Sequence, residues 1–391
     1  MKSFNLPLMS DNISREDINS VVDFLNQDPI PKLTNGPKVK EFEQKWSEWL
    51  GVKHSLMVNS GTAANELTML AIKYLYGEGE IIVPPLTWVS DVNSTLFAGF
   101  KPVFVDINLE NLSFDIEKLK EAINKNTKAI FLTHVLGLNG LTDELIQLCE
   151  DNNILLIEDV CESHGATFKG KKVGSEGFAS NFSFYFAHHM STIEGGVVCT
   201  NNDDFYQVCR ALRSHGMVRE CTDENFKLKI AKENPQCHPN FTFLAPAHNF
   251  RSTEINAVIG LSQLKNLDIN NFKRVDNFDY FMERLDSKKY ITTLNLEGQC
   301  NYAFIIIMKE PMLDKRNIIE KALTKNNIEF RRGLSGGGNQ TLQPFVRSNY
   351  DIDQKDFPNV NHIHNYSWYV GNYPTLTQDK INHLLKVLNN I

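Results

Sequence analysis

Three short segments carry residues that can bind anions or move protons, and each of them follows an apolar run. The first segment places Ser60, Gly61 and Thr62 between a predicted strand and a predicted helix. Such a turn directs backbone N–H groups and hydroxyls at an anion, and the helix dipole adds to the attraction. Ser and Thr are also ordinary helix caps, and taken alone the segment favours that simpler interpretation.

Acidic residues form the second segment, at the carboxyl end of the apolar run 155–158. Asp159 follows this run directly, and Glu162 comes three residues later. Ligands of open α/β sheets bind at the carboxyl ends of strands. An acid at that place can hold a protonated ring nitrogen, which makes a pyridine ring an electron sink. A carboxylate that caps the next helix is a common alternative.

The third segment contains two adjacent histidines, His188 and His189, between an aromatic run and Glu194-Gly195-Gly196. A histidine with an ordinary pKa of about 6.5 is largely neutral at neutral pH and can accept a proton. Neighbouring side chains on an extended segment point in opposite directions, so only one of the two can face a common ligand.

The three segments, in their order and spacing, resemble those of the DegT/DnrJ/EryC1/StrS family of sugar aminotransferases. The resemblance extends to the Pro-Pro-Leu-Thr-Trp segment that ends at Trp88 and to the His-Asn-Phe-Arg-Ser-Thr-Glu-Ile segment that begins at His248. It covers roughly the first two thirds of the chain strongly and the rest loosely. It implies the aspartate aminotransferase fold and a site for pyridoxal 5'-phosphate or pyridoxamine 5'-phosphate.

The resemblance also implies a role for each matching residue. Gly61, Thr62 and Ser183 would hold the cofactor phosphate, and Asn249 of the neighbouring subunit would complete that site. Trp88 would stack on the pyridine ring, Asp159 would pair with its nitrogen, and Glu162 would lie near the ring. A site shared in this way implies a homodimer.

The sequence departs from the family at one decisive position, because His188 stands where the family has its Schiff-base lysine. An imidazole cannot form an imine with an aldehyde, so the cofactor must be held by phosphate and ring contacts alone. The site then has a base without an amine. This pattern resembles the nucleotide-sugar 3-dehydratases, and it implies loss of water from C3 of a 4-ketosugar with His188 as the base.

Two types of 3-dehydratase remain open as the match. One takes a GDP-linked 4-keto-6-deoxymannose, has no metal centre and uses glutamate as its amino donor; His215 matches a histidine of this type and could support His188 or receive glutamate. The other takes a CDP-linked 4-keto-6-deoxyglucose and uses an iron–sulfur cluster. Segments 338–344 and 368–374 resemble the CDP type. The seven cysteines are widely spaced and form no CxxC pair, which argues against a metal centre and slightly favours GDP.

A pair of arginines, Arg331 and Arg332, precedes a glycine-rich stretch at 333–338. Guanidinium groups bind diphosphate and carboxylate groups well, so the pair could hold the substrate diphosphate or the glutamate carboxylate. A solvated pair is an equally good interpretation.

The composition is that of an ordinary globular protein, with 42% hydrophobic and 22% charged residues among 391. The net charge of -7 argues against a nucleic-acid or anionic membrane partner. Apolar runs are shorter than the roughly 18 residues of a membrane span, and no signal peptide is evident, so we expect a cytoplasmic location.

Apolar runs alternate with helical patterns, which predicts an α/β fold with a mostly parallel sheet. The predicted strands are 55–58, 80–83, 101–105, 129–133, 155–158, 182–186 and 196–200. The last two are too close for a crossover helix and indicate an antiparallel return. We predict a large cofactor-binding domain over 1–268 and a small α/β domain over 269–391, with a strand at 301–308 and helices at 316–326 and 378–388.

Two other functions remain possible for a chain of this kind. An inactive relative could bind a sugar nucleotide or the cofactor as a sensor or partner subunit, and an unusual sugar aminotransferase is a further alternative. Retention of Trp88, Asp159, Ser183 and Asn249 together favours catalysis over decay. The expected partners are therefore a nucleotide sugar, glutamate and a second copy of the chain.

Overall fold

A seven-stranded sheet forms the centre of the structure, a computed structural model that describes residues 4–10 and 12–391. Its order is β1-β9-β8-β5-β4-β2-β3. The strands are β1 (His54–Val58), β2 (Glu80–Val83), β3 (Lys101–Phe104), β4 (Thr127–Thr133), β5 (Leu155–Asp159), β8 (Ala179–Ser183) and β9 (Gly196–Thr200). Strands β8, β5, β4, β2 and β3 are parallel, whereas β9 is antiparallel to both of its neighbours. The predicted α/β class and the antiparallel return are confirmed.

The strand predicted at 182–186 lies three residues earlier, at Ala179–Ser183. The ladder with β9 ends where Ser183 stands opposite Gly196. Beyond this point the chain turns, and the His188 N–H donates to the carbonyl of Tyr185 at 3.0 Å. The aromatic residues after Ser183 continue the apolar pattern past the end of the strand, which is why the pattern misplaced it.

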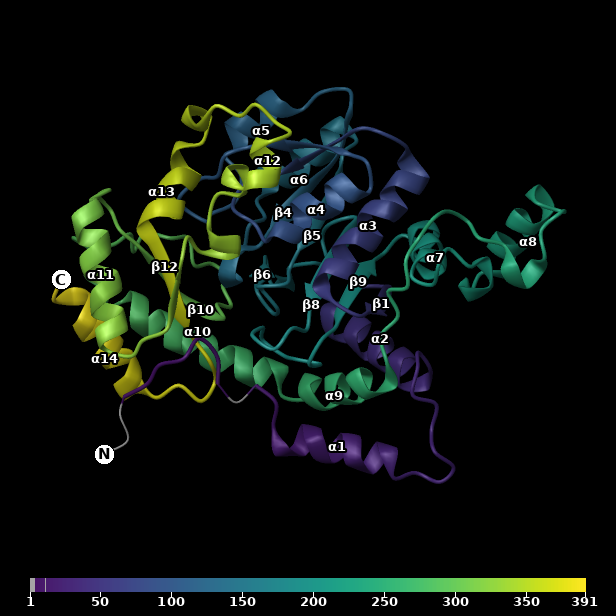
Figure 1. Ribbon diagram of the computed structural model, residues 1–391, viewed down its shortest axis with the longest axis horizontal. Helices are drawn as coiled ribbons and strands as arrows, with labels where there is room; N and C mark the ends of the chain where they lie inside the picture. Colours follow the sequence, from purple (N-terminus) through teal and green to yellow (C-terminus); the bar gives the residue numbers. More distant parts are fainter. Residues whose placement is uncertain (1–3, 11) are drawn as a thin grey trace.

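Helices cover both faces of the large sheet (Figure 1). Alternate residues of β4 belong to different apolar cores: Ile130 and Leu132 pack with Trp46, whereas Ala129 and Phe131 pack with Leu67. This alternation follows from the two-residue repeat of a strand, and it gives the sheet two buried faces. The covering helices are α2 (Pro37–Leu50), α3 (Gly61–Tyr76), α4 (Val89–Phe97), α5 (Ile116–Ala122), α6 (Asp143–Asn152), α7 (Asp203–Leu212) and α9 (Glu254–Leu264).

A second, antiparallel sheet of order β10-β12-β11 is built from the C-terminal part of the chain. Its elements are β10 (Ala303–Ile307), β11 (Phe330–Arg332) and β12 (Ser367–Gly371), with α10 (Leu267–Met282), α11 (Leu313–Lys325), α13 (Pro358–Tyr366) and α14 (Gln378–Asn389). Residues of α10 such as Phe278 and Phe281 share one core with this sheet. The bounds of β10, α11 and α14 agree to within a few residues with the strand and helices predicted for the small domain. The domain boundary at 268/269 stays a prediction.

The remaining elements are short or peripheral. They are α1 (Arg15–Leu25), α8 (Glu224–Glu233), α12 (Pro344–Arg347), the hairpin of β6 (Thr167–Phe168) with β7 (Lys171–Lys172), and the 3-10 turns η1 (Val135–Gly137), η2 (Val218–Glu220), η3 (Pro239–Phe241), η4 (Ser335–Gly337), η5 (Gln340–Leu342) and η6 (Gln354–Asp356). Within the described part of the chain, no helix has both the length and the apolar character needed to cross a membrane.

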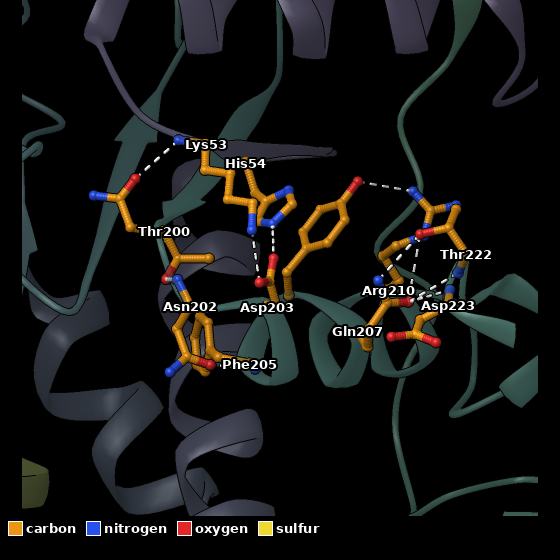
Figure 2. Close-up of polar contacts among 12 residues, drawn as sticks. Lys53, His54, Thr200, Asn202, Asp203, Phe205, Gln207, Arg210, Thr222 and Asp223 are labelled. Atoms are coloured by element: carbon orange, nitrogen blue, oxygen red, sulfur yellow. Dashed lines mark hydrogen bonds and ion pairs between the residues drawn. The ribbon is translucent and has the colours of Figure 1, made fainter. Parts of the chain in front are cut away.

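The segment 213–250, which we call the arm, leaves the body after α7 and carries α8 outward (Figure 1). Figure 2 shows how α7 anchors its base. The side-chain oxygen of Gln207 accepts hydrogen bonds from the N–H groups of Thr222, at 2.8 Å, and Asp223, at 3.2 Å. Nε of Arg210 donates to the carbonyl of Glu220 at 2.8 Å. These bonds attach the outgoing chain to a helix that itself packs against the large sheet.

Candidate active site

A cavity of about 820 Å³ lies at the carboxyl ends of the parallel strands and is closed on its other side by residues of the small sheet and its loops. Nine of the predicted site residues line it: Gly61, Thr62, Trp88, Asp159, Glu162, Ser183, His188, Arg331 and Arg332. His215 and Asn249 do not. The sequence therefore identified nine residues of one cavity, from segments that are far apart along the chain.

One end of the cavity is suited to an anion. Ser60 caps α3 by accepting a hydrogen bond from the Ala63 N–H at 3.0 Å. The first turn of a helix has N–H groups without partners inside the helix, and Gly61 and Thr62 occupy this turn. A Cβ atom at Gly61 would lie 2.5 Å from Cβ of Ser183, so the absence of a side chain lets the end of β8 approach the helix. A hydroxyl and the N-terminal end of a helix are groups that suit a phosphate.

Asp159 and Trp88 provide an anion and an aromatic ring in the same cavity. Asp159 ends β5 and is buried; its Oδ1 accepts a hydrogen bond from the Cys161 N–H at 2.8 Å, and its Oδ2 contacts Nδ2 of Asn65 at 3.3 Å. Trp88 stands at the start of α4 and is 53% exposed. A buried carboxylate and an accessible ring suit a flat heteroaromatic ligand with a protonated nitrogen.

Glu162 is held between the large sheet and the glycine-rich loop. Its Oε2 accepts a hydrogen bond from the Leu136 N–H at 3.1 Å, and its Oε1 accepts one from the Ser335 hydroxyl at 2.9 Å. Burial raises the pKa of Glu162 to about 7; the two hydrogen bonds oppose this rise and the charge of Asp159 adds to it. Glu162 can therefore hold or release a proton near neutral pH.

Only His188 of the two adjacent histidines lines the cavity. The extended segment from which we predicted this is wrong, because the chain turns here and the His188 N–H donates to the Tyr185 carbonyl. His188 lines the cavity, and its ring lies 5.8 Å from that of Tyr302 in an edge-on arrangement. His189 is buried, and its Nε2 lies 2.8 Å from the carbonyl oxygen of Cys300. Burial lowers the pKa of His188 to about 4, with Asp159 opposing the shift and Arg274 adding to it. His188 is thus a neutral proton acceptor, and no lysine is among the described residues that line the cavity.

The two arginines at the cavity differ in their partners. The guanidinium of Arg332 donates two hydrogen bonds to the carboxylate of Glu320, at 2.7 and 3.1 Å. Among the residues that the structure describes, Arg331 donates only to the carbonyl of the preceding Phe330, at 3.1 Å. Arg331 is therefore the member of the pair whose charge is available to an anionic ligand.

His215 and Asn249 both lie on the base of the arm and are exposed. Ser214 and Asn249 form an isolated bridge, and the His215 N–H donates to the carbonyl of His248 at 2.9 Å. The structure thus brings the two residues near each other but not into the cavity of their own chain.

Sequence reasoning missed several residues of the site. Tyr302 and Ser335 line the cavity from the small sheet and the glycine-rich loop, and Asp91 lies buried beside Asp159. The sequence did contain a local indication of the contact between Thr87 and Asp91, because the two residues are four positions apart at the start of a helix, where their side chains can meet. Tyr302 and Ser335 had no such indication, since they reach the cavity through tertiary packing. No cluster of three or more metal-binding side chains occurs among the described residues.

Comparison with known proteins places the chain among its relatives. Residues 11–389 match the DegT/DnrJ/EryC1/StrS aminotransferase family. The chain belongs to this family. Its solved members include a GDP-4-keto-6-deoxymannose-3-dehydratase with a trapped PLP-glutamate geminal diamine, which has a TM-score of 0.88 and 29% identity and is matched over 98% of this chain and 100% of that one. The predicted aminotransferase fold is confirmed.

Two curated family members illustrate the range of functions. GDP-4-keto-6-deoxy-D-mannose 3-dehydratase of Escherichia coli O55:H7 is 31% identical over 98% of this chain and 99% of its own length. UDP-4-amino-4,6-dideoxy-N-acetyl-beta-L-altrosamine transaminase of Campylobacter jejuni is 33% identical, over 73% of this chain and 71% of its own. The family thus contains both dehydratases and transaminases. Which of the two reactions this chain can perform depends on the residues of its cavity.

Proposed function

We propose that the chain is a pyridoxal/pyridoxamine phosphate-dependent dehydratase that removes the C3 hydroxyl of a nucleotide-linked 4-keto-6-deoxyhexose. One observation carries the proposal: the cavity presents His188 and no lysine among its described lining residues. A transaminase of this family needs a lysine amine at the cofactor, whereas a dehydratase needs a base there. The full-length similarity to a GDP-4-keto-6-deoxy-D-mannose 3-dehydratase supports this choice and favours the GDP-linked mannose sugar over the CDP-linked glucose sugar.

The residues present fit the cofactor. We assign the phosphate to Gly61, Thr62 and Ser183, because a helix end and a hydroxyl converge there. Asp159 is the partner for the ring nitrogen, and the exposed face of Trp88 is available for stacking. When bound, the cofactor supplies a pyridinium ring that withdraws electrons from the attached substrate.

His188 supplies the base in this proposal. Burial lowers its pKa to about 4 in the cofactor-free protein, so the ring is neutral and a ring nitrogen is free to take a proton, whereas the same burial makes it a weaker base than an exposed histidine. Glu162, with a pKa of about 7, holds a second proton in the same cavity. Arg331 is placed to bind a substrate diphosphate or the glutamate carboxylate, because its guanidinium has no carboxylate partner in residues 4–10 and 12–391, whereas Arg332 has Glu320.

We further propose that the enzyme works as a homodimer with shared sites. Asn249 and His215 lie outside the cavity of their own chain, on an arm that projects from the body (Figure 1). In this arrangement Asn249 of the partner subunit completes the phosphate site, and His215 of the partner subunit supports His188 or receives glutamate. L-Glutamate is the proposed amino donor.

The net reaction balances without another oxidant or reductant. The sugar exchanges its C3 hydroxyl for hydrogen, and glutamate is oxidised at its amine-bearing carbon, so that 2-oxoglutarate and ammonia leave. Incubation with the GDP-linked 4-keto-6-deoxymannose or the CDP-linked 4-keto-6-deoxyglucose, together with glutamate and cofactor, tests this balance when the products are measured by mass spectrometry. A product that has lost one oxygen, with equal ammonia, supports the proposal. An amino sugar that keeps its C3 hydroxyl would identify a transaminase, and unchanged sugar would indicate an inactive relative.

Borohydride reduction provides an independent test of the missing lysine. The purified protein is reduced in the presence of pyridoxal phosphate, digested and examined by peptide mass spectrometry. We expect no cofactor-labelled lysine in the wild type and a labelled position 188 in His188→Lys. A labelled lysine in the wild-type cavity would overturn the proposal.

A further inference from the structure

Asp91 is a fully buried carboxyl group in the first turn of α4, in contact with Asp159. Its Oδ2 accepts hydrogen bonds from the hydroxyls of Thr87, at 2.6 Å, and Thr133, at 3.1 Å. Its Oδ1 lies 2.7 Å from Nδ2 of Asn65, the same nitrogen that contacts Oδ2 of Asp159 at 3.3 Å. Two acidic side chains from different elements therefore share one amide nitrogen beneath the cavity.

Among the residues that the structure describes, no Lys, Arg or His side chain forms a hydrogen bond or ion pair with Asp91 or Asp159. Two adjacent buried carboxylates without a counter-ion are strongly unfavourable, and such pairs share a proton instead. Burial raises the pKa of Asp91 well above its usual range, and the charge of Asp159 and a hydrogen bond to it raise it further, while Thr87 and Thr133 oppose the rise.

The proton belongs on Asp91 rather than on Asp159. Asp91 is farther from the cavity, because it is absent from the cavity wall whereas Asp159 is part of it. Asp159 also accepts a backbone N–H bond, from Cys161, which stabilises its ionised form. The start of α4 favours an anion at Asp91, but the effect of a helix dipole is smaller than the cost of desolvating a second buried charge.

We propose that Asp91 is a positioning residue that stays protonated and donates a hydrogen bond to Oδ2 of Asp159, so that the pair presents a single negative charge to the cavity. With Asn65 at Oδ2 and the Cys161 N–H at Oδ1, this bond fixes the orientation of the Asp159 carboxylate. The role rests on the proposed function, in which Asp159 faces the ring nitrogen of the cofactor. Asp91 then keeps Asp159 anionic, because a donated hydrogen bond makes a carboxylate less basic.

Infrared spectroscopy of the cofactor-free protein tests where the proton resides. Spectra are recorded above pH 8, in a Glu162→Gln background, so that Glu162 contributes no protonated-carboxyl band. We expect such a band in the parent and its loss in Asp91→Asn. Asp106→Asn is the matched control: Asp106 is equally buried but accepts hydrogen bonds from two backbone N–H groups and from Lys118, so its substitution should leave the band unchanged. A band that survives Asp91→Asn would overturn the proposal.

Nitrogen-15 NMR of ring-labelled pyridoxal phosphate tests the effect on the site. The bound ring nitrogen should be protonated in the wild type and in Asp91→Asn, since the amide still donates to Asp159. In Asp91→Val the Asp159 carboxylate becomes more basic, so we expect the shared proton to shift toward Asp159 and the ring signal to move toward that of the unprotonated ring. We also expect cofactor affinity to fall about tenfold, the effect of one hydrogen bond to a charged group. Equal ring signals in Asp91→Val and the wild type would contradict the positioning role.

The variant Asp159→Asn separates the two proposals. If it leaves the ring-nitrogen signal of the wild type unchanged, the placement of the cofactor under the proposed function is wrong. If it abolishes ring protonation while the infrared band is insensitive to Asp91→Asn, the cofactor placement stands and the role of Asp91 alone is wrong. Asp91→Asn nearly preserves size and shape, so the infrared test does not depend on folding of the valine variant.

Discussion

The hydroxyl of Ser335 donates a hydrogen bond to Oε1 of Glu162 at 2.9 Å and so joins the glycine-rich loop to the segment that follows β5. Both residues are buried and both line the cavity. The bond therefore links the small sheet to a titratable group whose pKa of about 7 makes it sensitive to small changes in its surroundings.

Glu162 should make the cofactor-free protein less stable as pH rises. Its pKa is about 7 in the folded state against 4.5 for an unperturbed glutamate, so the folded protein binds the proton more tightly than the unfolded chain does. The contribution of Glu162 to the free energy of unfolding is complete below about pH 4.5 and is lost as pH rises through about 7. Denaturant unfolding measured from about pH 4.5 to above about pH 7 should show a smaller decline in the free energy of unfolding for Glu162→Gln than for the wild type. An identical decline in both proteins would contradict the raised pKa.

Removal of the Ser335 hydroxyl should raise the pKa of Glu162 further. The hydroxyl stabilises the ionised carboxylate, and a hydrogen bond to a charged group corresponds to a shift of about one pH unit. The infrared band of the protonated Glu162 carboxyl, followed against pH in Ser335→Ala, measures the shift. Ser163→Ala is the control, because the Ser163 hydroxyl donates to the His134 carbonyl and not to Glu162. A downward shift in Ser335→Ala would refute the assignment.

Substitution of His188 should abolish dehydration without unfolding the protein. A general base contributes about a hundredfold to ten-thousandfold to a rate, and we expect kcat to fall by this factor in His188→Asn. His189→Asn is the matched comparison, because His189 contacts the Cys300 carbonyl away from the cavity. It should lower the thermal midpoint and leave kcat within a few-fold. Equal losses of kcat in the two variants would exclude His188 as the specific base.

The arginine pair should divide into a binding residue and a structural one. Within the described part of the chain Arg331 has no carboxylate partner, whereas Arg332 is paired with Glu320. Arg331→Ala should raise KM for the nucleotide sugar or for glutamate about tenfold or more, as expected for loss of a charge-assisted hydrogen bond. Arg332→Ala should change either KM by less than about threefold. Steady-state kinetics with each substrate varied in turn would also show which anion Arg331 binds.

Shared sites predict complementation between two inactive variants. If Asn249 serves the opposite subunit, a mixed dimer of His188→Asn and Asn249→Ala contains one intact site and one doubly altered site. Random reassociation of equal amounts should then restore about a quarter of the wild-type activity. No recovery, despite mixed dimers detected by native mass spectrometry, would show that each chain uses its own Asn249.

The glycine turn, the acid after a strand and the histidine pair could be recognised from local sequence, because each depends on a few consecutive residues. The alternation of apolar runs with helical patterns likewise predicted the sheet. One predicted strand, β8, was clearly displaced, because aromatic residues continue beyond its last pair with β9. The different partners of Arg331 and Arg332 could not be predicted. Glu320 lies in α11, and its pairing with Arg332 depends on how that helix packs against β11.

By itself the sequence determined the family-type segments, the approximate positions of the strands along the chain and the presence of histidine at position 188, because all three depend on local residue patterns. Only the tertiary structure decided which charged groups meet. It brought Asp91 to Asp159, Ser335 to Glu162, and left His215 and Asn249 outside their own cavity. The physical reason is that pKa values and partners depend on burial and on contacts between elements far apart in the chain, and local patterns do not encode these distances.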